Sequence, residues 1–424
     1  MANIDDLSHE LEKIGISSCS ETADSWRKCS DLINKTHVPQ QLTGHDRPCE
    51  EKDFQNYHTT LINNLQQIQN IIQQESQMPI KKIGLDLILV IGEQSEKNPW
   101  TTDESLKISQ LLLSDIYKLF GADNVSQILC YDDNMTTVLT MLRQKLLKDN
   151  WKTYPAAVTC YKWILNQTEI PQLSKYLSDI LPTALIIFDD YIPENRLIGL
   201  ECIYRIIQHS TMQKEFIENG YADVIYDAVE RLAHHRDSRY TIPLYACITQ
   251  ILANIDQRES STNHFEWTRR DDVISTLLDN MELEQDLELR HAYMLCLPQL
   301  LTNLGCAKWC ERLTRVLSEY CSHHTDLRTL KATLLAAETV LSTFQLRIPA
   351  HCTTLYSAFL KLHFDLTETP IFDNDIINSL ERCIQTLYKL TPNIGSVIIR
   401  DDRMKNIINN SVQFSCTGDI KYCN

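Results

Sequence analysis

The stretch Asp326-Leu-Arg-Thr-Leu-Lys-Ala-Thr-Leu-Leu-Ala-Ala-Glu-Thr-Val-Leu341 decides the fold. Its apolar positions include Leu327, Leu330, Leu334 and Leu341, which are three, four and seven residues apart and so share one face of an α-helix. Asp326 can accept hydrogen bonds from the unpaired amides of the first turn, and its charge suits the positive end of the helix dipole. The stretch therefore predicts an amphipathic helix that begins just after an aspartate cap.

The same arrangement recurs along the chain. The aspartates that precede an apolar helical stripe are Asp190, Asp237, Asp286, Asp326 and Asp375, and their residue numbers differ by 47, 49, 40 and 49. Periods of about 40–47 residues are typical of paired-helix arrays of the HEAT or armadillo type, in which neighbouring units stack to bury their apolar faces. We therefore expect an all-α fold, an α-solenoid of degenerate HEAT/armadillo-like paired helices, rather than an irregular bundle. All five aspartates are expected to be caps.

Composition agrees with a helical, acidic protein. The chain has only 10 glycines, where average usage of about 7% would give roughly 30, so tight turns and phosphate-binding loops are scarce. Its 40 basic and 56 acidic residues give a net charge of −16, which disfavours binding to the phosphates of nucleic acids. We expect protein partners with basic surfaces and no nucleic acid.

The 15 cysteines are scattered singly and form no Cys-x-x-Cys pair, which indicates reduced cytosolic thiols. The first 17 residues lack the apolar core of a secretory signal. The strongest apolar run, Ile83 to Ile91, contains Asp86 and is far shorter than the roughly 20 residues that a membrane crossing needs. We therefore expect no membrane association and a cytoplasmic location, with the nucleus as a second compartment.

Four segments are predicted. Residues 1–52 are polar and expected to be partly disordered, residues 53–180 form an N-terminal helical region, residues 181–402 form the HEAT-like array, and residues 403–424 are a tail.

Two groups of residues suggest chemistry. Asp189 and Asp190 with Glu194 resemble a metal-binding or catalytic carboxylate cluster, but they sit in a turn before a helical stripe, where capping explains them. A zinc site could draw on Cys306, Cys310, Cys321 and His323, although their spacing matches no standard finger. The chain has no Gly-rich phosphate loop, nucleophile elbow or His-Glu-x-x-His motif. We therefore predict no catalytic residue, no metal and no cofactor.

Several aromatic residues have two interpretations. They are either interface anchors or core residues between repeats. These residues are Trp100, Trp151, Trp163, Tyr191 and Trp309.

One stretch resembles a known family. The sequence LPTALIIFDDYIPENRLIGLECIYRII, residues 181–207, is similar to the signature of the Tti-two family of Tel-two-interacting proteins, in its Leu-Pro, Asp-Asp-Tyr, Glu-Asn, Gly and Cys pattern. Three further segments resemble the same family: Asn150-Trp-Lys-Thr-Tyr-Pro-Ala-Ala157, Asn98-Pro-Trp100, and Leu289-Arg-His-Ala-Tyr293 with Leu297-Pro298 and Leu304-Gly305. The resemblance covers roughly residues 98–305, and the short, glycine-poor amino terminus departs from it.

The resemblance implies a subunit of the Triple-T co-chaperone complex, with the Tel-two and Tti-one proteins as partners. It also implies an indirect link to the phosphatidylinositol-kinase-related kinases, the class of mTOR, ATM and ATR, and to the ninety-kilodalton heat-shock chaperone. Such a role needs a stacked binding surface and no catalysis.

The residues predicted to contact a partner lie around Asp190, before the apolar stripe that follows it, and on a later helix. They are Asp189, Asp190, Tyr191, Glu194 and Asn195, with Arg290 and Tyr293 as a second set. A HEAT-repeat trafficking or transport adaptor is the alternative function, and a metal-dependent hydrolase built on Asp189 and Asp190 is a third.

Overall fold

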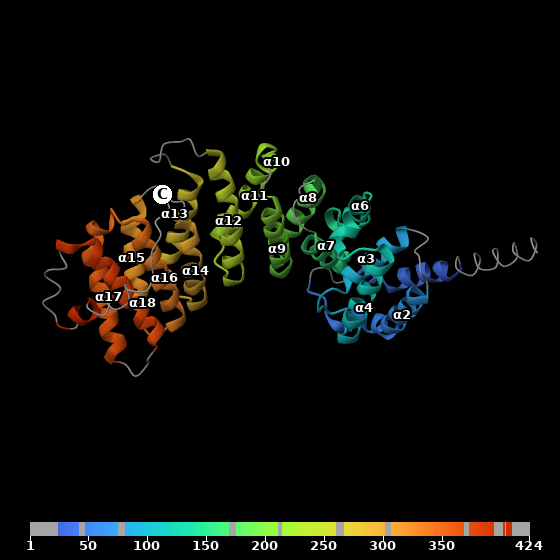
Figure 1. Cartoon of the computed structure of the whole chain (residues 1–424), viewed down its shortest axis with the longest axis horizontal. Coiled ribbons are helices and arrows are strands. Elements are labelled where there is room, and N and C mark those ends of the chain that lie inside the picture. Colours follow the sequence, from blue (N-terminus) through green and yellow to red (C-terminus); the bar gives the residue numbers. More distant parts are fainter. Residues whose placement is uncertain are drawn as a thin grey trace, which may run out of the picture. The chain divides into compact units, whose positions relative to one another are not determined.

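The structure is a computed structural model of the 424-residue chain. It describes residues 24–41, 47–74, 81–168, 175–210, 214–259, 267–301, 307–368, 373–393, 402 and 404–408, and these form α-helices and short 3-10 helices with no β-strand among them. No helix in these ranges is long and apolar enough to span a bilayer. The chain divides into two compact units, Met1–Gln213 (unit 1) and Lys214–Asn424 (unit 2), which Figure 1 shows in sequence colours.

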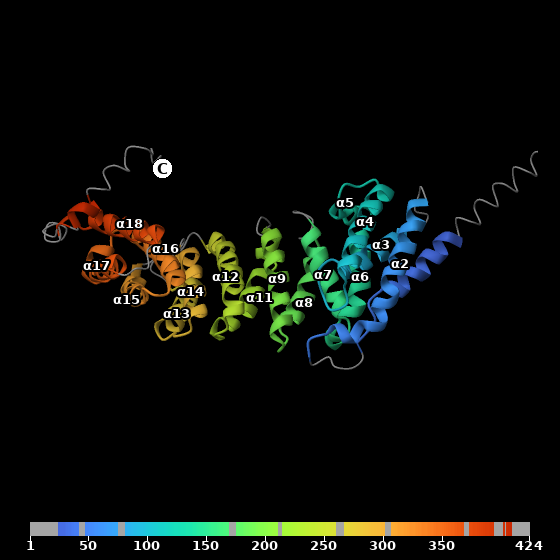
Figure 2. The ribbon, with the colours of Figure 1, turned by 90° about the horizontal axis from the view of Figure 1, so that it is seen from below.

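Unit 2 is a stack of helix pairs. After the short α10 (Lys214–Glu218), the pairs are α11 (Tyr221–Glu230) with α12 (Ser238–Glu259), α13 (Arg269–Glu282) with α14 (Leu287–Leu301), α15 (Cys310–Cys321) with α16 (Leu327–Thr343), and α17 (Cys352–Glu368) with α18 (Asn374–Leu390). Each even-numbered helix contacts the next even-numbered one, and α13, α15 and α17 contact in the same way. The two rows are visible in Figure 2. Three 3-10 helices join elements: η4 (Arg231–His234), η5 (Ala307–Trp309) and η6 (Ile348–His351).

Unit 1 contains a helix over residues 24–36 and a further set of packed helices. They are η1 (Glu51–Phe54), α2 (Gln55–Gln74), α3 (Lys81–Glu93), α4 (Asp103–Phe120), α5 (Val125–Cys130), α6 (Asn134–Leu146), η2 (Lys148–Thr153), α7 (Pro155–Gln167), α8 (Leu177–Phe188) and α9 (Pro193–Ser210). Helix α7 lies between α3 and α9, and α6 contacts α8. The layered pairs of both units confirm the predicted all-α, solenoid-type fold.

The apolar stripes form the core. On α16, Leu330, Leu334 and Leu341 are at most 1% exposed, because α16 packs between α14 and α18. Ala336 and Ala337 on the same helix are fully buried, and their small side chains let neighbouring helices approach closely. A single pair could not cover these faces, so each pair depends on its neighbours for stability.

Three of the five predicted aspartate caps are confirmed. The Asp326 side chain accepts a hydrogen bond from the Thr329 amide at the start of α16. Asp286 accepts from the Leu289 amide, and Asp237 accepts from the Arg239 amide, each at the first turn of its helix.

Two of the caps were predicted wrongly. Helix α18 is capped by Asp373, whose carboxylate accepts from the amides of Asp375 and Ile376, so Asp375 lies inside the first turn. Asp190 lies three residues before α9, which begins at Pro193, and its carboxylate contacts the side chains of Lys152 in η2 and Asn195 in α9. The first error arises because Asp373 lies nearer to the start of α18, and the second because Asp190 lies three residues before Pro193 and is held by side chains.

The predicted segment boundaries at residues 52, 180 and 402 stay predictions. Within the first segment, residues 24–36 are helical and bury Trp26, Cys29 and Ile33. Within the predicted tail, residues 404–408 are described, and Met404 and Ile407 are buried.

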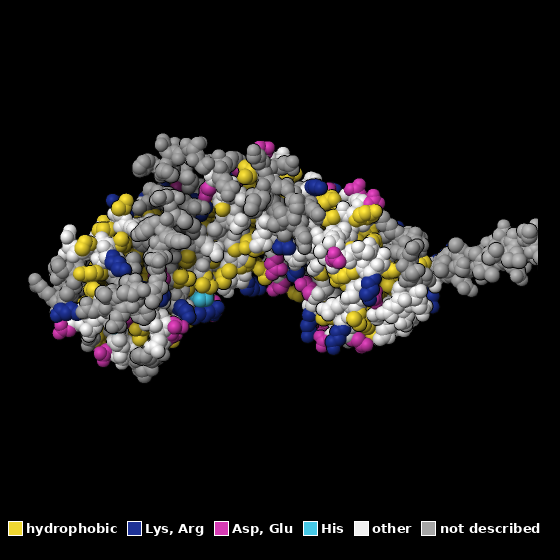
Figure 3. Space-filling model, viewed as in Figure 1, with side chains coloured by type: hydrophobic (Ala, Val, Ile, Leu, Met, Phe, Trp, Pro, Cys, Tyr) yellow, Lys and Arg dark blue, Asp and Glu magenta, His cyan; other side chains and the backbone are white. Residues whose placement is uncertain are grey.

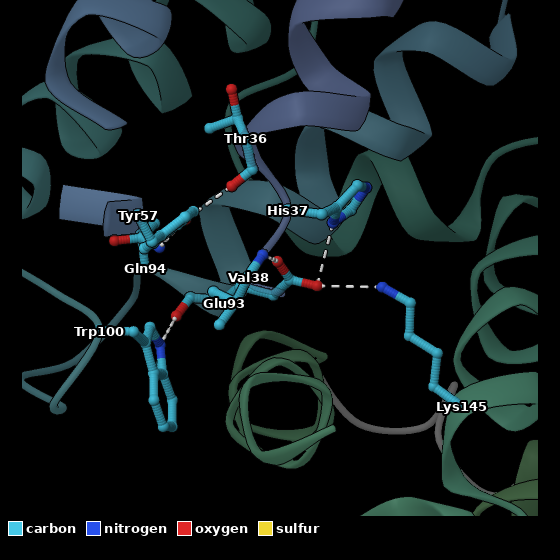
Figure 4. Close-up of polar contacts among 8 residues, drawn as sticks. All are labelled: Thr36, His37, Val38, Tyr57, Glu93, Gln94, Trp100 and Lys145. Carbon is cyan, nitrogen blue, oxygen red and sulfur yellow. Dashed lines mark hydrogen bonds and ion pairs between the residues drawn. The ribbon is translucent and has the colours of Figure 1, made fainter. Parts of the chain in front are cut away.

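A buried carboxylate joins several helices of unit 1 (Figure 4). The Glu93 side chain at the end of α3 is 2% exposed. Its Oε1 atom lies 3.0 Å from His37 Nδ1 and 3.1 Å from Lys145 Nζ, and its Oε2 atom accepts a hydrogen bond from the Val38 backbone amide at 3.0 Å. The Trp100 indole nitrogen donates to the Glu93 carbonyl at 2.9 Å. A buried charge needs such partners to remain ionised.

A second chain of hydrogen bonds lies beside it. The side-chain Nε2 of Gln94 donates to the Tyr57 hydroxyl, which in turn donates to the backbone carbonyl of Thr36 at 2.6 Å. The Ser105 hydroxyl donates to the Gln94 amide oxygen. These bonds tie the 24–36 helix to α2, α3 and α4.

We predict that Glu93 makes unit 1 sensitive to acid. Burial alone raises the pKa of Glu93, but the His37 hydrogen bond and the charges of His37 and Lys145 outweigh it and lower that pKa below its ordinary 4.5. As the pH falls, the unfolded chain therefore takes up a proton on Glu93 at a higher pH than the folded chain does. The stabilisation from ionised Glu93 is present above pH 4.5 and is lost as the pH falls through the folded pKa. Nearby Asp86 has a pKa that burial raises, so its contribution has the opposite sign.

Comparison of the wild type with Glu93→Gln isolates the contribution of Glu93 ionisation to the acid sensitivity of unit 1. The variant is expected to be less stable at neutral pH but to lose less stability below pH 4.5, as measured by urea unfolding followed by circular dichroism at several pH values. Equal acid slopes for the two proteins would contradict this role for Glu93.

Candidate interaction surface

Three segments that resemble the Tti-two family meet in unit 1. Residues 98–100 follow α3, and residues 150–157 include the end of η2 and the start of α7. Residues 189–195 comprise the turn between α8 and α9 and the first residues of α9. They line a cavity of about 200 Å³, to which they contribute Asn98, Trp100, Trp151, Lys152, Ile192 and Asn195. We call these three segments the signature cluster. The fourth segment, residues 289–293, lies on α14 in unit 2.

An ion pair joins two segments of the signature cluster, residues 150–157 and 189–195. The Asp190 side chain is 2% exposed, and its carboxylate lies 2.7 Å from Lys152 Nζ and accepts a hydrogen bond from Asn195 Nδ2, also at 2.7 Å. The Asp190 carbonyl accepts from Arg196 Nε at 3.0 Å. The turn before α9 is thereby fixed to η2, and the Asp190 charge is compensated where water has little access.

Lys152 also contacts two aromatic rings. Its ammonium nitrogen lies 4.5 Å from the ring centroid of Tyr191 and 5.6 Å from that of Trp151. Cation–π contacts of this kind stabilise by about 0.5–2 kcal/mol. Trp151 is buried, whereas Tyr191 is 60% exposed, so the lysine links the core to an aromatic ring on the surface.

Gly199 explains another part of the resemblance. A Cβ atom at this position would lie 2.3 Å from the Phe188 amide nitrogen, which is backbone and has no rotamer to move. Helices α8 and α9 therefore approach as closely as they do because the residue is glycine. Cys202, one turn later, is buried, and burial raises the pKa of its thiol to about 12, so it acts as an apolar core residue.

The predicted contact residues of the signature cluster divide by exposure. Asp189, Tyr191 and Glu194 are exposed, Asn195 is half-buried, and Asp190 is buried. In the isolated chain, Asp189, Tyr191 and Glu194 are therefore accessible to a partner. Their contact with a partner stays a prediction.

The second predicted set lies inside unit 2. Arg290 and Tyr293 are 2% and 1% exposed. The Arg290 guanidinium lies 3.8 Å from the ring centroid of Tyr320 and donates to the Glu284 carbonyl at 3.1 Å, so it joins α14 to α15. In the isolated chain both residues belong to the core, and their contact with a partner also stays a prediction.

The residues considered above for a metal or catalytic site have the following contacts. Asp190 is occupied by a lysine and an amide, and within the described ranges no group of three His, Cys, Asp or Glu residues could hold a metal ion. Cys310 and Cys321 are buried in α15, His323 is exposed beyond its end, and Cys306 lies outside the described residues. Burial raises the pKa of the Cys321 thiol to about 12.

The aromatic residues with two interpretations also divide. Trp100, Trp151 and Trp309 are at most 6% exposed and are core residues, Trp163 is intermediate, and Tyr191 is exposed. Sequence reasoning missed Lys152, although it lies in a segment quoted for the resemblance. The signal available was a lysine between two aromatic residues, Trp151 and Tyr154.

We predict that loss of Lys152 destabilises unit 1 more than loss of a comparable lysine. Lys152→Met leaves the Asp190 carboxylate buried without a counter-charge, which costs about 3–5 kcal/mol. The double variant with Asp190→Asn should recover much of that loss, because no buried charge then remains unpaired. Denaturant midpoints measured by circular dichroism test this.

Lys162→Met is the matched control. Lys162 is similarly half-buried, but its partners Glu96 and Glu201 are 40% and 49% exposed, so water can solvate them once the lysine is gone. If Lys152→Met and Lys162→Met unfold at the same denaturant concentration, the Asp190 pair does not have the assigned role.

Comparisons with known proteins agree with the predicted resemblance. The Tti2 family model matches residues 133–236, which contain Lys152, Asp190 and Gly199. TELO2-interacting protein 2 of Rattus norvegicus is 27% identical over 290 residues, 65% of this chain and 56% of that protein. The Homo sapiens protein of the same name is 26% identical over 301 residues, 67% and 58% of the two chains. The chain thus spans little more than half the length of the curated relatives that it matches.

Among solved structures, a chain from a complex of Kap95p and RanGDP is similar over 78% of this chain and 39% of its own, with 13% sequence identity and a TM-score of 0.48. Neither fold nor function is inferred from a similarity of that level. The family model and the curated relatives confirm the resemblance of this chain to the Tti2 family, which the model matches over residues 133–236.

Proposed function

We propose that the chain is a non-catalytic scaffold that binds homologues of Tel-two and Tti-one as a subunit of a Triple-T co-chaperone complex. The observation that carries the proposal is the family match, since the relatives are named for their interaction with TELO2. The complex would stabilise and mature phosphatidylinositol-kinase-related kinases together with the ninety-kilodalton heat-shock chaperone. We place it in the cytoplasm and in the nucleus.

The architecture supports a binding role. Stacked helix pairs expose long rows of side chains, and proteins of this architecture use such rows to hold partners. The matched region contains two of the three segments of the signature cluster, residues 150–157 and 189–195. The Lys152 and Asp190 pair fixes the turn that holds Tyr191 and leads into the first turn of α9, where Glu194 lies. A rigid, exposed tyrosine loses little conformational entropy on binding and is a common interface anchor.

We expect the tagged full chain, purified from its own cells at moderate salt, to retain Tel-two and Tti-one homologues in near-equal amounts by mass spectrometry. Recovery of transport factors in their place would contradict the proposal and would favour the adaptor function. Either result identifies the partner class directly.

The same purification tests the predicted contact residues. A Tyr191→Ala and Glu194→Ala variant should recover less of both partners, because it removes an aromatic anchor and a charge from the exposed turn. Tyr131→Ala is the control, since Tyr131 is 70% exposed and lies outside the signature cluster. Unchanged recovery with unchanged helicity would remove Tyr191 and Glu194 from the interface without affecting the scaffold proposal.

A further inference from the structure

A second surface feature lies on unit 2, on the row formed by α14, α16 and α18. A groove of about 440 Å³ crosses these three helices. Its walls contain two exposed leucines and four charged side chains, which are Leu295, Leu335, Arg328, Lys331, Arg382 and Glu338. In Figure 3, hydrophobic side chains lie among basic and acidic ones on the described surface of unit 2.

The helical repeat places these residues together. Arg328, Lys331 and Leu335 are three and four residues apart on α16, on a different face from the buried Leu330 and Leu334. Leu295 on α14 and Arg382 on α18 come from the two helices that pack against α16 on either side. The groove therefore exists because three helix pairs stack in register.

The two leucines are unusual for their exposure. Leu335 is 54% exposed and Leu295 is 39% exposed, whereas most leucines of unit 2 are buried; Leu283, Leu287 and Leu346 are also exposed but do not line the groove. Adjacent exposed apolar side chains inside a concavity are typical of a binding surface. One wall of the groove also contains His291, whose Nδ1 atom is buried without a hydrogen-bond partner among the described residues.

The charges around the leucines are mostly basic. Three cations and one carboxylate line the groove of a chain whose net charge is −16. Arg328, Lys331 and Arg382 are each 60–64% exposed. Of their carboxylate partners, Glu288 is 65% exposed, Asp375 is 78% exposed and Glu338 is 30% exposed, and the Lys331 contact with Asp375 is long, at 3.8 Å. Exposed pairs of this kind stabilise a fold by only about 0–1 kcal/mol, so carboxylates of a ligand can replace the partners at little cost.

We propose that this groove binds an acidic amphipathic segment of a partner protein, with leucine-like side chains against Leu295 and Leu335 and carboxylates facing Arg328, Lys331 and Arg382. A basic or neutral segment would leave the cations without new partners, so the charge pattern selects an acidic one. The inference rests on the scaffold function and names a surface and a partner chemistry for it.

The test uses the purified full chain and two fluorescently labelled synthetic helical peptides. Both peptides have leucines on one face, and their remaining positions are glutamate in one and lysine in the other. The chain should bind the glutamate peptide more tightly by fluorescence anisotropy, and added salt should weaken that binding. Leu335→Glu and Arg382→Glu should each weaken it roughly tenfold, because they remove an apolar anchor and reverse a charge.

Two controls match these variants in exposure. Leu111→Glu replaces a leucine of unit 1 that is 55% exposed. Arg315→Glu replaces an arginine of α15 that is 63% exposed and paired with Glu282, as Arg382 is 60% exposed and paired with Glu338. Both controls should bind the glutamate peptide as the wild type does, with circular dichroism confirming that all variants fold.

Equal affinity for the two peptides, or equal affinity of groove variants and controls, would overturn the proposal. Self-association of the chain that Leu335→Glu abolishes in sedimentation experiments would also overturn it, by assigning the groove to a second copy. Because the peptides need no cellular partner, failure of the scaffold function would appear separately, as loss of Tel-two and Tti-one homologues from the wild-type purification.

Discussion

Burial of apolar helix faces is the constraint on which the structure depends. Each stripe is wider than one partner helix can cover, so α16 needs both α14 and α18, and the same holds along each row. Fully buried side chains such as Leu334 and Ala336 have no room for water on any side. Stacking leaves outward faces that the core does not use, and those faces supply the exposed residues for binding.

Charges inside this apolar frame are placed in pairs. Asp190 with Lys152, and Glu93 with His37 and Lys145, lie in unit 1 between helices that are distant in sequence. Ionised groups are tolerated there because each has a partner and further hydrogen bonds. These pairs fix the positions of particular helices relative to one another, whereas the apolar stripes require only that helices stack.

The fold was predictable from sequence because its signals are local. The stripe after Asp326 repeats every three or four residues, and Asp237, Asp286 and Asp326 cap the helices that they precede. Asp375 shows the limit of such reasoning, since Asp373 competes for the same amides and has the better position. The 24–36 helix had a usable signal too, because Trp26, Cys29 and Ile33 are three and four residues apart.

The candidate surfaces were less predictable because they depend on distant contacts. The Asp190 carboxylate is attached to η2 by Lys152, 38 residues earlier in the chain, and sequence spacing contains no sign of that pair. The groove on unit 2 combines side chains from three helices, each of which looks like an ordinary solvated face alone. The family resemblance identified the segments of the signature cluster but not their meeting in space.

The most direct test of a binding scaffold is hydrogen–deuterium exchange of the full chain, alone and mixed with purified Tel-two and Tti-one homologues. The account predicts slower amide exchange over contiguous exposed surfaces on partner addition, with the buried cores of both units protected in both states. Identical exchange with and without partners, at concentrations at which the two partners bind each other, would contradict it.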